Sequence, residues 1–541
     1  MLQEIICLPK WLVKRVTGYA GDYIHHMAEI ATDLTESLST QGERRLTIAL
    51  VWPKGFDPTY SIPLPYGYFK NNLDKDRYKI VIIDNAIEGR SCRDSSFLEE
   101  LRACDPDVVG VSTWSPMFIE ALEVLQVAKE IKPSVVTVMG GAHASSYFKR
   151  IIGTPQIDFI IRGEAERSFG EFLDQLQTTT PDWTTVKGLV YPVDDGYEYN
   201  EPDLNQDLDS IAIPDYEAIQ LERYVKAGYR WNSPPTGNAP IWVTRGCPYR
   251  CQYCAAPDLN GRPVRTHSIE YMMNWIKYLY DTRKVRWFNI IDDNFTYHVK
   301  YAKEFCRAVI DLDLDGVGFG TPNGVRMERG DPELWQLMKQ AGWQTLMVAP
   351  ESGSAHTLAL MKKDLAVGLV PKAVQDIRNA GLKVQGFFII GYPGETIEDL
   401  EESVKLIMDC KFNFVFLNSF QPLPGTPVYD ALVEKGEIPD GLLPNSYSDG
   451  KKAYIAKELK DFNYSKFILM THLKMMWNDP ANIPFHFSLM FKRFSPTFVL
   501  KKVGMIFWNM CFPKQQIKND VVFEPMHHTG QVVASTVLGS K

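Results

Sequence analysis

The chain has 541 residues, of which 45% are hydrophobic, so it is long enough for two or three globular domains with sizeable cores. Its formal net charge of −8 at pH 7 argues against general nucleic-acid binding, which favours a basic surface. Nine cysteines in a chain of this length do not make a secreted disulfide framework and instead fit a reducing compartment.

The first residues carry no sign of export or membrane insertion. Residues 1–15 lack an apolar core followed by a small-residue cleavage site, so we expect no signal peptide. No apolar run reaches the length of about 18 residues that a spanning helix needs. We therefore expect a cytoplasmic protein that opens with a polar, partly helical extension over residues 1–45.

Residues 46–180 alternate short apolar runs with helical periodicity. The runs lie at 46–52, 79–84, 108–112, 135–139 and 159–161. This alternation predicts an α/β, Rossmann-like domain with a doubly wound parallel sheet, whose ligands bind beyond the carboxyl ends of the strands. Small, hydroxyl and charged residues follow those ends: Asp84, Ser112, Thr113, Gly140, Gly141, His143, Gly163 and Glu164.

After a connector at 181–235 that is rich in Thr, Asp and Pro, the alternation resumes over residues 236–435. Six strand candidates lie at 241–244, 287–291, 317–320, 345–349, 384–390 and 414–418. They predict a partial (β/α)6 barrel of the TIM type, whose chemistry would collect at the carboxyl ends of the strands.

Three cysteines follow the first of these strands. Cys247, Cys251 and Cys254 are separated by three residues and then by two, so one loop can carry all three thiolates. Three thiolates can bind three irons of a 4Fe–4S cubane and leave the fourth iron open for a substrate or cofactor. The alternative is a zinc site, which needs a fourth ligand, and the next candidate is His267.

The segment Cys247-Pro-Tyr-Arg-Cys251-Gln-Tyr-Cys254 resembles the radical S-adenosylmethionine superfamily, and the resemblance extends over roughly residues 236–435. It implies that the open iron chelates S-adenosylmethionine, which one-electron reduction then cleaves to a 5′-deoxyadenosyl radical. The resemblance places cofactor contacts at Tyr253 in the loop and at residues that follow later strands: Asp292, Glu351, Ser352 and Gly391.

The first domain resembles the cobalamin-binding domain that is joined to many of these enzymes. That family often carries D-x-H-x-x-G, in which the histidine binds cobalt from below. Here the segment reads Asp84-Asn-Ala86-Ile-Glu-Gly89, so alanine replaces the histidine. We therefore expect cobalamin without a histidine lower ligand. The contacts that we expect with cobalamin are Asp84, Ser112, Thr113, Gly140, Gly141, His143, Gly163 and Glu164.

Together the two resemblances imply a cobalamin-dependent radical methyltransferase acting on an unactivated carbon or a phosphorus centre. Alternatives are a cyclase or rearrangement enzyme with the same cofactors, a methylthiotransferase of transfer RNA, and a non-catalytic cobalamin sensor. The acidic chain and the lack of a grouped cysteine triad in the first domain disfavour the transfer-RNA enzyme. The expected partners are a flavodoxin or ferredoxin as electron donor and an organic substrate, with no nucleic acid. No catalytic side chain is readable.

Residues 436–541 are expected to be mostly helical. Residues 467–477 and 484–512 are rich in Phe, Met, Leu and Trp, interleaved with the cations Lys492, Arg493, Lys501 and Lys502. This composition is typical of a helical cap on the barrel, but it also suits a lid over a lipid-like substrate or a peripheral membrane contact.

Overall fold

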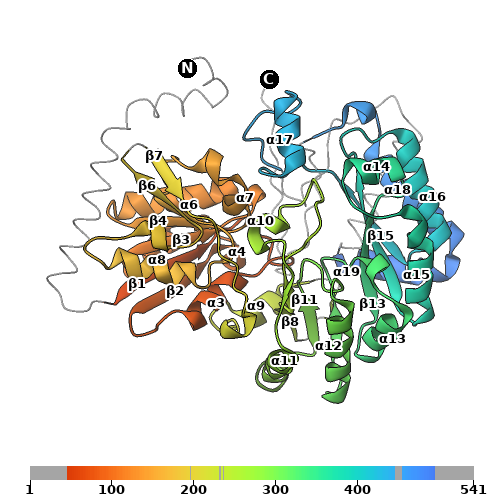
Figure 1. Ribbon diagram of the computed structural model, residues 1–541, viewed down its shortest axis with the longest axis horizontal. Coiled ribbons are helices and arrows are strands. Elements are labelled where there is room, and N and C mark those ends of the chain that lie inside the picture. Colours follow the sequence, from red (N-terminus) through yellow and green to blue (C-terminus); the bar gives the residue numbers. More distant parts are fainter. Residues whose placement is uncertain (1–44, 195, 231–232, 235–236, 445–453, 494–541) are drawn as a thin grey trace.

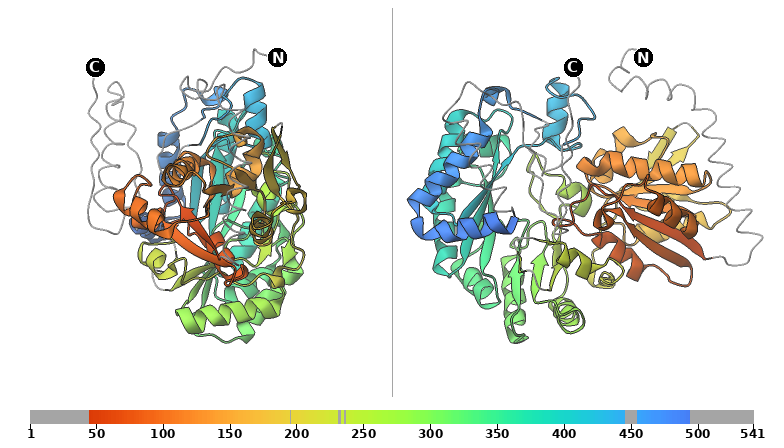
Figure 2. Two further views of the ribbon diagram at one scale, coloured as in Figure 1. Left: turned by 90° about the vertical axis from the view of Figure 1, so that its left-hand side faces the viewer. Right: turned by 180° about the vertical axis from the view of Figure 1, so that it is seen from behind.

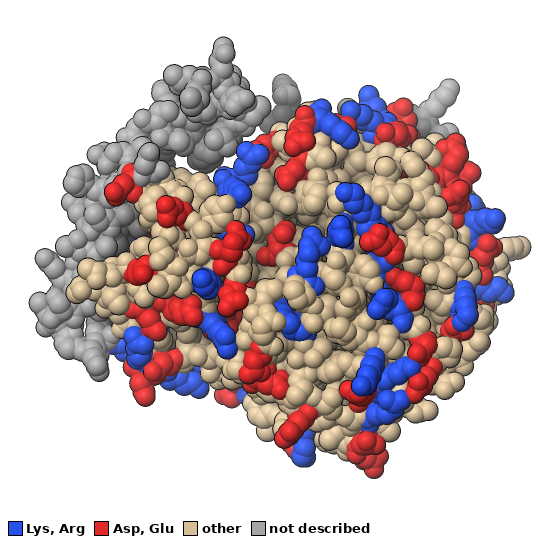
Figure 3. Space-filling model, in the orientation of Figure 1, with Lys and Arg blue, Asp and Glu red and all other residues tan. Residues whose placement is uncertain are grey.

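A computed structural model describes residues 45–194, 196–230, 233–234, 237–444 and 454–493, so nearly all of the predicted extension at 1–45 lies outside the described residues. Figure 1 shows an α/β domain in red to yellow beside a second α/β body in green to blue. None of the described helices has the length and apolarity that crossing a membrane would require. On the face in Figure 3, acidic and basic side chains are interspersed.

The first domain is built on a seven-stranded sheet in the order β2-β1-β3-β4-β5-β6-β7. Its first five strands are parallel, as the sequence predicts. Helices cover both faces, so the strands are buried on both sides and their sequences are almost continuously apolar. The five strands are β1 (Leu46–Trp52), β2 (Tyr78–Asp84), β3 (Val108–Ser112), β4 (Val136–Gly140) and β5 (Phe159–Ile161).

The helices of this domain, with one in the connector, are α3 (Leu64–Asn72), α4 (Asn85–Glu88), α5 (Ser95–Cys104), α6 (Phe118–Ile131), α7 (Ala142–Ile151), α8 (Ser168–Leu176) and α9 (Leu221–Lys226). The connector differs from the expectation, because it contributes two antiparallel strands to this sheet. These are β6 (Leu189–Val193) and β7 (Gly196–Tyr199). The sheet therefore extends past residue 180. Because β7 is exposed at the sheet edge, its sequence lacks the apolar alternation that marks a strand.

The second body is a six-stranded parallel barrel made of two three-stranded halves. The first half holds β8 (Asn238–Ile241), β11 (Trp287–Ile290) and β12 (Gly318–Gly320). The second half holds β13 (Thr345–Glu351), β14 (Lys383–Ile390) and β15 (Phe414–Ser419). Isolated parallel bridges, Phe319 to Trp343 and Val325 to Val348, join the halves between β12 and β13.

The helices between the strands include one that follows the cysteines, α10 (Ala256–Asn260). The others are α11 (Ile269–Arg283), α12 (Val299–Asp311), α13 (Pro332–Gln340), α14 (Ala355–Leu360), α15 (Val370–Asn379), α16 (Ile397–Cys410) and α17 (Pro427–Glu434). Beyond them, α18 (Tyr464–Asn478) and α19 (Ile483–Arg493) lie on the outer side of the second barrel half (Figure 2). The part of the predicted helical segment beyond residue 493 lies outside the described residues.

The strand predicted at 241–244 is divided in the structure. β8 ends at Ile241, and β9 (Thr244–Arg245) pairs instead with the antiparallel strand β10 (Arg265–Thr266). The chain turns away because Asp292, after β11, accepts hydrogen bonds from the backbone N–H groups of Val243 and Thr244, both at 2.8 Å. The small β9–β10 hairpin encloses the cysteine loop.

Candidate active site

The cysteine loop leaves β9 through Gly246, whose φ is +96°. A Cβ on this residue would lie 2.2 Å from the carbonyl oxygen of Pro263, so only glycine fits the turn. The Cys247 N–H then donates to the carbonyl of Gly261 at 3.1 Å, and the Cys254 N–H donates to that of Cys251 at 3.3 Å. The loop is thus folded by its own backbone, and its three cysteines are free and partly exposed.

The donor set fits an iron–sulfur cluster. Burial raises the pKa of Cys247, and it raises that of Cys254 to about 12, so their thiolates need a cationic partner. Among the described residues, no three His, Cys, Asp or Glu side chains converge on a site for one metal ion. A cubane does not require such convergence, because each of the three thiolates binds a different iron.

Asp292, one of the predicted S-adenosylmethionine contacts, is buried beneath this loop. Its two carboxylate oxygens accept the N–H groups of Val243 and Thr244, and burial raises its pKa to about 8. The next residue, Asp293, faces the cysteines and raises the pKa of both Cys247 and Cys254. Nothing in the sequence Asp292-Asp293 shows which of the two carboxylates accepts the backbone N–H groups and which one faces the cysteines.

Three other predicted S-adenosylmethionine residues lie together. Tyr253 packs edge-on against Tyr392, with 6.4 Å between ring centroids, and Tyr392 follows Gly391. Burial raises the pKa of Tyr253 well above its ordinary value, and the neighbouring Glu351 carboxylate adds to this shift. The cysteine loop, the end of β13 and the end of β14 therefore meet at one point.

Glu351 is held in an unusual backbone conformation. Its φ is +67°, at a register shift between Val348 and Glu351 where β13 ends. Such a conformation costs a non-glycine residue about 1–3 kcal/mol and is found mainly at functional sites. Its Oε1 lies 3.2 Å from Nζ of Lys363, and both side chains are buried.

Ser352, by contrast, is fully buried and turned away from this meeting point. Its Oγ lies 3.2 Å from Oγ of Ser403 on α16, and it accepts the N–H of Ser354 at 3.1 Å. A Cβ on Gly353 would lie 2.6 Å from Cα of Ser403. The Ser-Gly-Ser turn, which includes the predicted cofactor residue Ser352, is therefore a packing contact with α16.

Gly391 forms a tight turn, with a φ of +81°. Its N–H donates to Oε2 of Glu395 at 2.5 Å, and burial raises the pKa of Glu395 to about 7. A Cβ on Gly391 would lie 2.5 Å from the Tyr464 hydroxyl oxygen, so α18 packs directly on this turn. The C-terminal region thus supports the cofactor end of the barrel.

The structure adds a cation that the sequence did not reveal. Arg326 lies in the loop after β12 and donates through Nη2 to the carbonyls of Lys363 and Asp364, at 2.7 and 2.8 Å. Its guanidinium carbon lies 3.6 Å from the ring centroid of Tyr249, which belongs to the cysteine loop. Its Nη1 is buried with no hydrogen-bond partner among the described residues, so it can receive an anionic group.

The carboxyl edge of the first sheet offers backbone surface at three of the predicted residues: Ser112, Gly140 and Gly141 are partly exposed. Gly141 has a φ of +90°, and a Cβ there would lie 2.7 Å from Oγ of Ser112 and from the Thr113 nitrogen. Thr113 is fully buried, its backbone bonds to Gly140 and His143, and its Oγ1 donates to the Trp114 carbonyl at 2.9 Å.

His143 is a core residue. It is 1% exposed, its Nδ1 lies 2.9 Å from Oγ of Ser115, and its ring packs against Phe118 with centroids 4.4 Å apart. Burial lowers its pKa to about 3. Its Nε2 is buried and has no hydrogen-bond partner among the described residues.

Asp84 begins the short helix α4. Its Oδ1 accepts the N–H groups of Ala86 and Ile87, both at 3.1 Å, and the Tyr224 hydroxyl donates to Oδ2 at 2.6 Å. Burial raises its pKa to about 6. Both oxygens thus accept hydrogen bonds within the protein, one as a cap of α4 and the other from Tyr224 of α9.

Glu164, a predicted cobalamin contact, joins the two domains. Its carboxylate receives two hydrogen bonds from Arg265 on β10, at 2.5 and 2.7 Å, and the two side chains are 5% and 4% exposed. Glu166 pairs in the same way with Arg245, the last residue of β9, at 2.8 Å. A buried set of four charges therefore fixes the end of the first sheet against the hairpin that carries the cysteines.

Helix packing completes this junction. Helix α10, which follows Cys254, lies against α7 of the first domain. A Cβ on Gly163, at the end of β5, would lie 3.0 Å from Cβ of Pro202 and 3.6 Å from the Leu259 carbonyl of α10. The carboxyl edge of the first sheet is thereby placed beside the cysteine loop.

This edge fits a large polar cofactor. Buried polar atoms near the ends of β1, β2, β4 and β5 have no hydrogen-bond partner among the described residues: Trp52 Nε1, Asn85 Nδ2, His143 Nε2, and Nε and Nη1 of Arg162. Buried polar groups are rarely left unpaired in folded proteins. A ligand rich in amides, such as cobalamin, supplies the acceptors and donors that such an edge lacks.

Comparison with known proteins agrees with both halves of this site. The model of the B12 binding domain matches residues 59–173, and that of the radical SAM superfamily matches residues 241–407. The chain is 27% identical to cytidylyl-2-hydroxyethylphosphonate methyltransferase of Streptomyces wedmorensis, over 70% of this chain and 79% of that protein. It is 28% identical to anaerobic magnesium-protoporphyrin IX monomethyl ester cyclase of Rubrivivax gelatinosus, over 70% and 67% of the two chains.

A solved structure shares the fold. The radical S-adenosylmethionine methyltransferase TsrM of Kitasatospora setae, with cobalamin and a [4Fe–4S] cluster bound, aligns with a TM-score of 0.61 at 17% identity, over 75% of this chain and 80% of that one. With the geometry above, the match of residues 59–173 to the B12 binding domain and of residues 241–407 to the radical SAM superfamily supports a cobalamin-binding radical S-adenosylmethionine enzyme, whose cofactors are a 4Fe–4S cluster, S-adenosylmethionine and cobalamin.

Proposed function

We propose that the protein is a methyltransferase that methylates an unactivated carbon or phosphorus centre. The observation that carries the proposal is the junction of the two domains, where buried pairs between Glu164 and Arg265 and between Glu166 and Arg245 hold the cobalamin edge beside the cysteine loop. When bound, the cofactors would supply radical initiation at the cluster and a transferable methyl group at cobalt.

The residues that would hold the cluster and S-adenosylmethionine come from three strand ends. Cys247, Cys251 and Cys254 would bind iron, while Tyr253, Glu351 and the Gly391 turn would line the S-adenosylmethionine site. Arg326 would pair with a carboxylate, because its Nη1 is buried and has no acceptor among the described residues. Lys363 pairs with Oε1 of Glu351 and so helps to hold this carboxylate in place beside Tyr253.

The cobalamin would be held mainly by backbone groups. Ser112, Gly140 and Gly141 present partly exposed backbone, and Gly163 would keep the edge narrow at α10. We propose that no histidine binds cobalt from below, because Ala86 stands in the usual position and His143 is enclosed by Phe118 and Ser115. The electron paramagnetic resonance spectrum of reduced, protein-bound cobalamin should lack nitrogen splitting from the protein. Splitting that disappears in His143→Gln would contradict this.

Product analysis tests methylation. The protein is reconstituted without oxygen, supplied with S-adenosylmethionine and a host extract, and followed by mass spectrometry. Methylation predicts S-adenosylhomocysteine together with 5′-deoxyadenosine, and a compound that is heavier by one methylene unit. Cys254→Ala should abolish 5′-deoxyadenosine formation, whereas Cys104→Ala, at a partly exposed thiol outside the loop, should not.

A cyclase is the second candidate, because relatives such as the Rubrivivax gelatinosus enzyme carry that name. It predicts 5′-deoxyadenosine without a stoichiometric yield of S-adenosylhomocysteine and without the added methylene mass.

The electron donor would be a flavodoxin or a ferredoxin. A cobalamin sensor would bind its ligand equally well after all three loop cysteines were replaced, and it would not need them for its response.

A further inference from the structure

The C-terminal helices present apolar side chains to solvent. On α18, Trp477 is 88% exposed and Leu473 is 42% exposed. These residues are four apart, so they lie on one face of the helix. Pro480 and Ala481, in the short helical turn that follows α18, are exposed as well. A tryptophan with so little protein contact is unusual, because its large ring contributes more than most side chains when it is buried.

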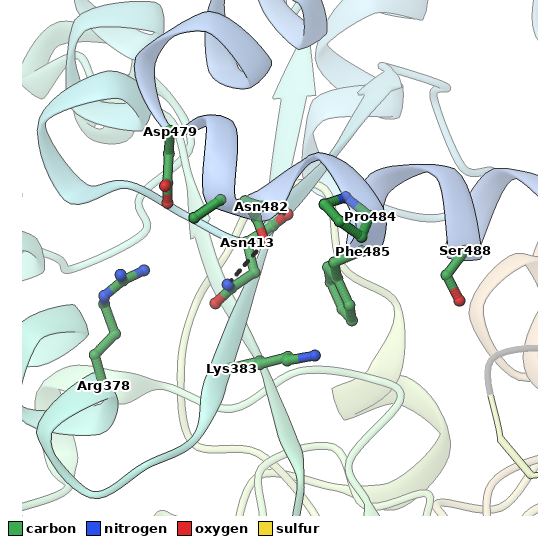
Figure 4. A pocket seen from close by; sticks show the side chains of 9 residues that line it. Arg378, Lys383, Asn413, Asp479, Asn482, Pro484, Phe485 and Ser488 are labelled. Carbon is green, nitrogen blue, oxygen red and sulfur yellow. Dashed lines mark hydrogen bonds between the residues drawn. The ribbon is translucent and has the colours of Figure 1, made fainter.

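A groove of about 470 Å³ is lined by Asp479 and Ala481, which directly follow α18 in the chain (Figure 4). Arg378 and Lys383, from the end of α15 and the start of β14, lie on one side of it, and α19 with the turn before it lies on the other. The lining residues are Arg378, Lys383, Asn413, Asp479, Ala481, Asn482, Pro484, Phe485 and Ser488.

The cations of this groove are not neutralised. Within the described ranges, neither Arg378 nor Lys383 forms an ion pair; Arg378 donates to the Lys411 carbonyl at 2.6 Å, and Nζ of Lys383 lies 4.4 Å from the ring centroid of Phe485. Exposed Lys474, next to Leu473 on α18, adds a third positive charge. The one carboxylate that lines the groove is that of Asp479.

We propose that this face docks on an anionic lipid bilayer. Trp477 and Leu473 would enter the boundary between headgroups and acyl chains, and Arg378, Lys383 and Lys474 would meet lipid phosphates. Interfacial helices combine an apolar face with neighbouring cations in this way. Because the whole chain carries a net charge of −8, attraction to anionic lipid has to come from a local patch and not from the protein's overall field.

The position of the patch is compatible with catalysis. Lys383 and Asn413 stand at the amino ends of β14 and β15, whereas the cysteine loop and the Gly391 turn stand at carboxyl ends. Docking would therefore hold the enzyme at a membrane while the active-site end points away from the lipid surface. The inference concerns attachment and does not depend on which reaction the site performs.

Vesicle flotation of the full-length protein tests this inference. Vesicles of phosphatidylglycerol and phosphatidylcholine should carry the protein upward, and vesicles of phosphatidylcholine alone should carry less. Replacing both Trp477 and Leu473 with serine should lower the partition by about tenfold, and Trp477→Phe alone should retain most of it. The double variant Arg378→Gln and Lys383→Gln should lose the preference for phosphatidylglycerol. Tyr278→Ser, at a 39% exposed ring on α11, is the matched control and should change nothing.

Two results would overturn the inference. One is an unchanged partition of the Trp477 and Leu473 double variant into anionic vesicles. The other is a concentration-dependent dimer, seen by sedimentation without vesicles, that the same two substitutions abolish, since this would make a second copy the occupant of the face. Thermal unfolding midpoints within about 2 °C of the unmodified protein would show that the surface substitutions leave the fold intact.

Discussion

The buried pair between Glu164 and Arg265 provides the sharpest test of how the two domains are held together. Arg265 is 4% exposed and has four acceptor contacts: two from the Glu164 carboxylate and one each from the carbonyls of Asn205 and Asn260. Glu164→Ala removes the two charged contacts and leaves the guanidinium buried with neutral acceptors. Removing one partner of a buried pair costs about 3–5 kcal/mol. We expect about 3 kcal/mol here, because two carbonyl acceptors remain.

Urea unfolding of the apoprotein at pH 7, followed by far-ultraviolet circular dichroism, measures this cost. The double variant Glu164→Ala and Arg265→Met removes the stranded charge along with its partner, so we expect it to recover at least half of the lost stability. A loss of less than about 1 kcal/mol in the single variant would refute the reasoning. So would a double variant whose loss equals the sum of the two single losses, because no coupling between the partners would remain.

Three further predictions concern single sites. Gly141→Ala should lower stability and cobalamin binding far more than Gly89→Ala. Both glycines have a positive φ, but only a Cβ at Gly141 would meet other atoms. Parallel urea and cobalamin titrations of the two variants can check this. Burial lowers the pKa of His143 to about 3, so the unfolded chain binds its proton below about pH 6.5 and the folded protein does not. From pH 7 to pH 5, the unfolding free energy should therefore fall by about 2 kcal/mol more than in His143→Gln, and equal slopes would contradict this. Asp292→Asn should lower the unfolding free energy by about 1–3 kcal/mol in the same assay, because the amide oxygen can accept only one of the two N–H groups from Val243 and Thr244. An unchanged unfolding midpoint would be evidence against a stabilising role of these two hydrogen bonds.

Much of the fold could be predicted because its strands are buried on both faces. β1 to β5 and β11 to β15 are apolar runs, and such runs differ clearly from the amphipathic helices between them. β7 could not be found this way, since it lies at the sheet edge and is mostly exposed. β6 is mostly buried and apolar, but it follows β5 as an antiparallel strand and so lies outside the strand–helix alternation of the parallel sheet. The division of the first barrel strand also escaped prediction, because it depends on Asp292, which is distant in sequence from Val243.

The cysteine loop was predictable because its chemistry is local: three thiolates within eight residues. The intramolecular partners of polar residues in the first domain were not predictable, because hydrogen bonds within a fold depend on neighbours from other segments. Asp84 is paired with Tyr224, and Glu164 with Arg265, and in each case the partner lies about a hundred residues or more along the chain. A polar residue at a strand end is therefore weak evidence for a ligand until its intramolecular partners are known.

The open barrel has a consequence for how the molecule can be divided. Its six strands leave a seam between β8 and β15, and the first domain touches both sides of that seam. On one side are the Arg245 and Arg265 pairs; on the other, Ser146 of α7 donates to the Pro424 carbonyl at 3.1 Å and Tyr147 donates to Asp440 at 2.5 Å. The first domain thus packs across the gap between β8 and β15 that the six strands leave open. A fragment that begins after residue 235 would lack the domain that covers this gap. It would also expose Arg245 and Arg265, which are buried in the whole protein, so the two domains are best regarded as one folding unit.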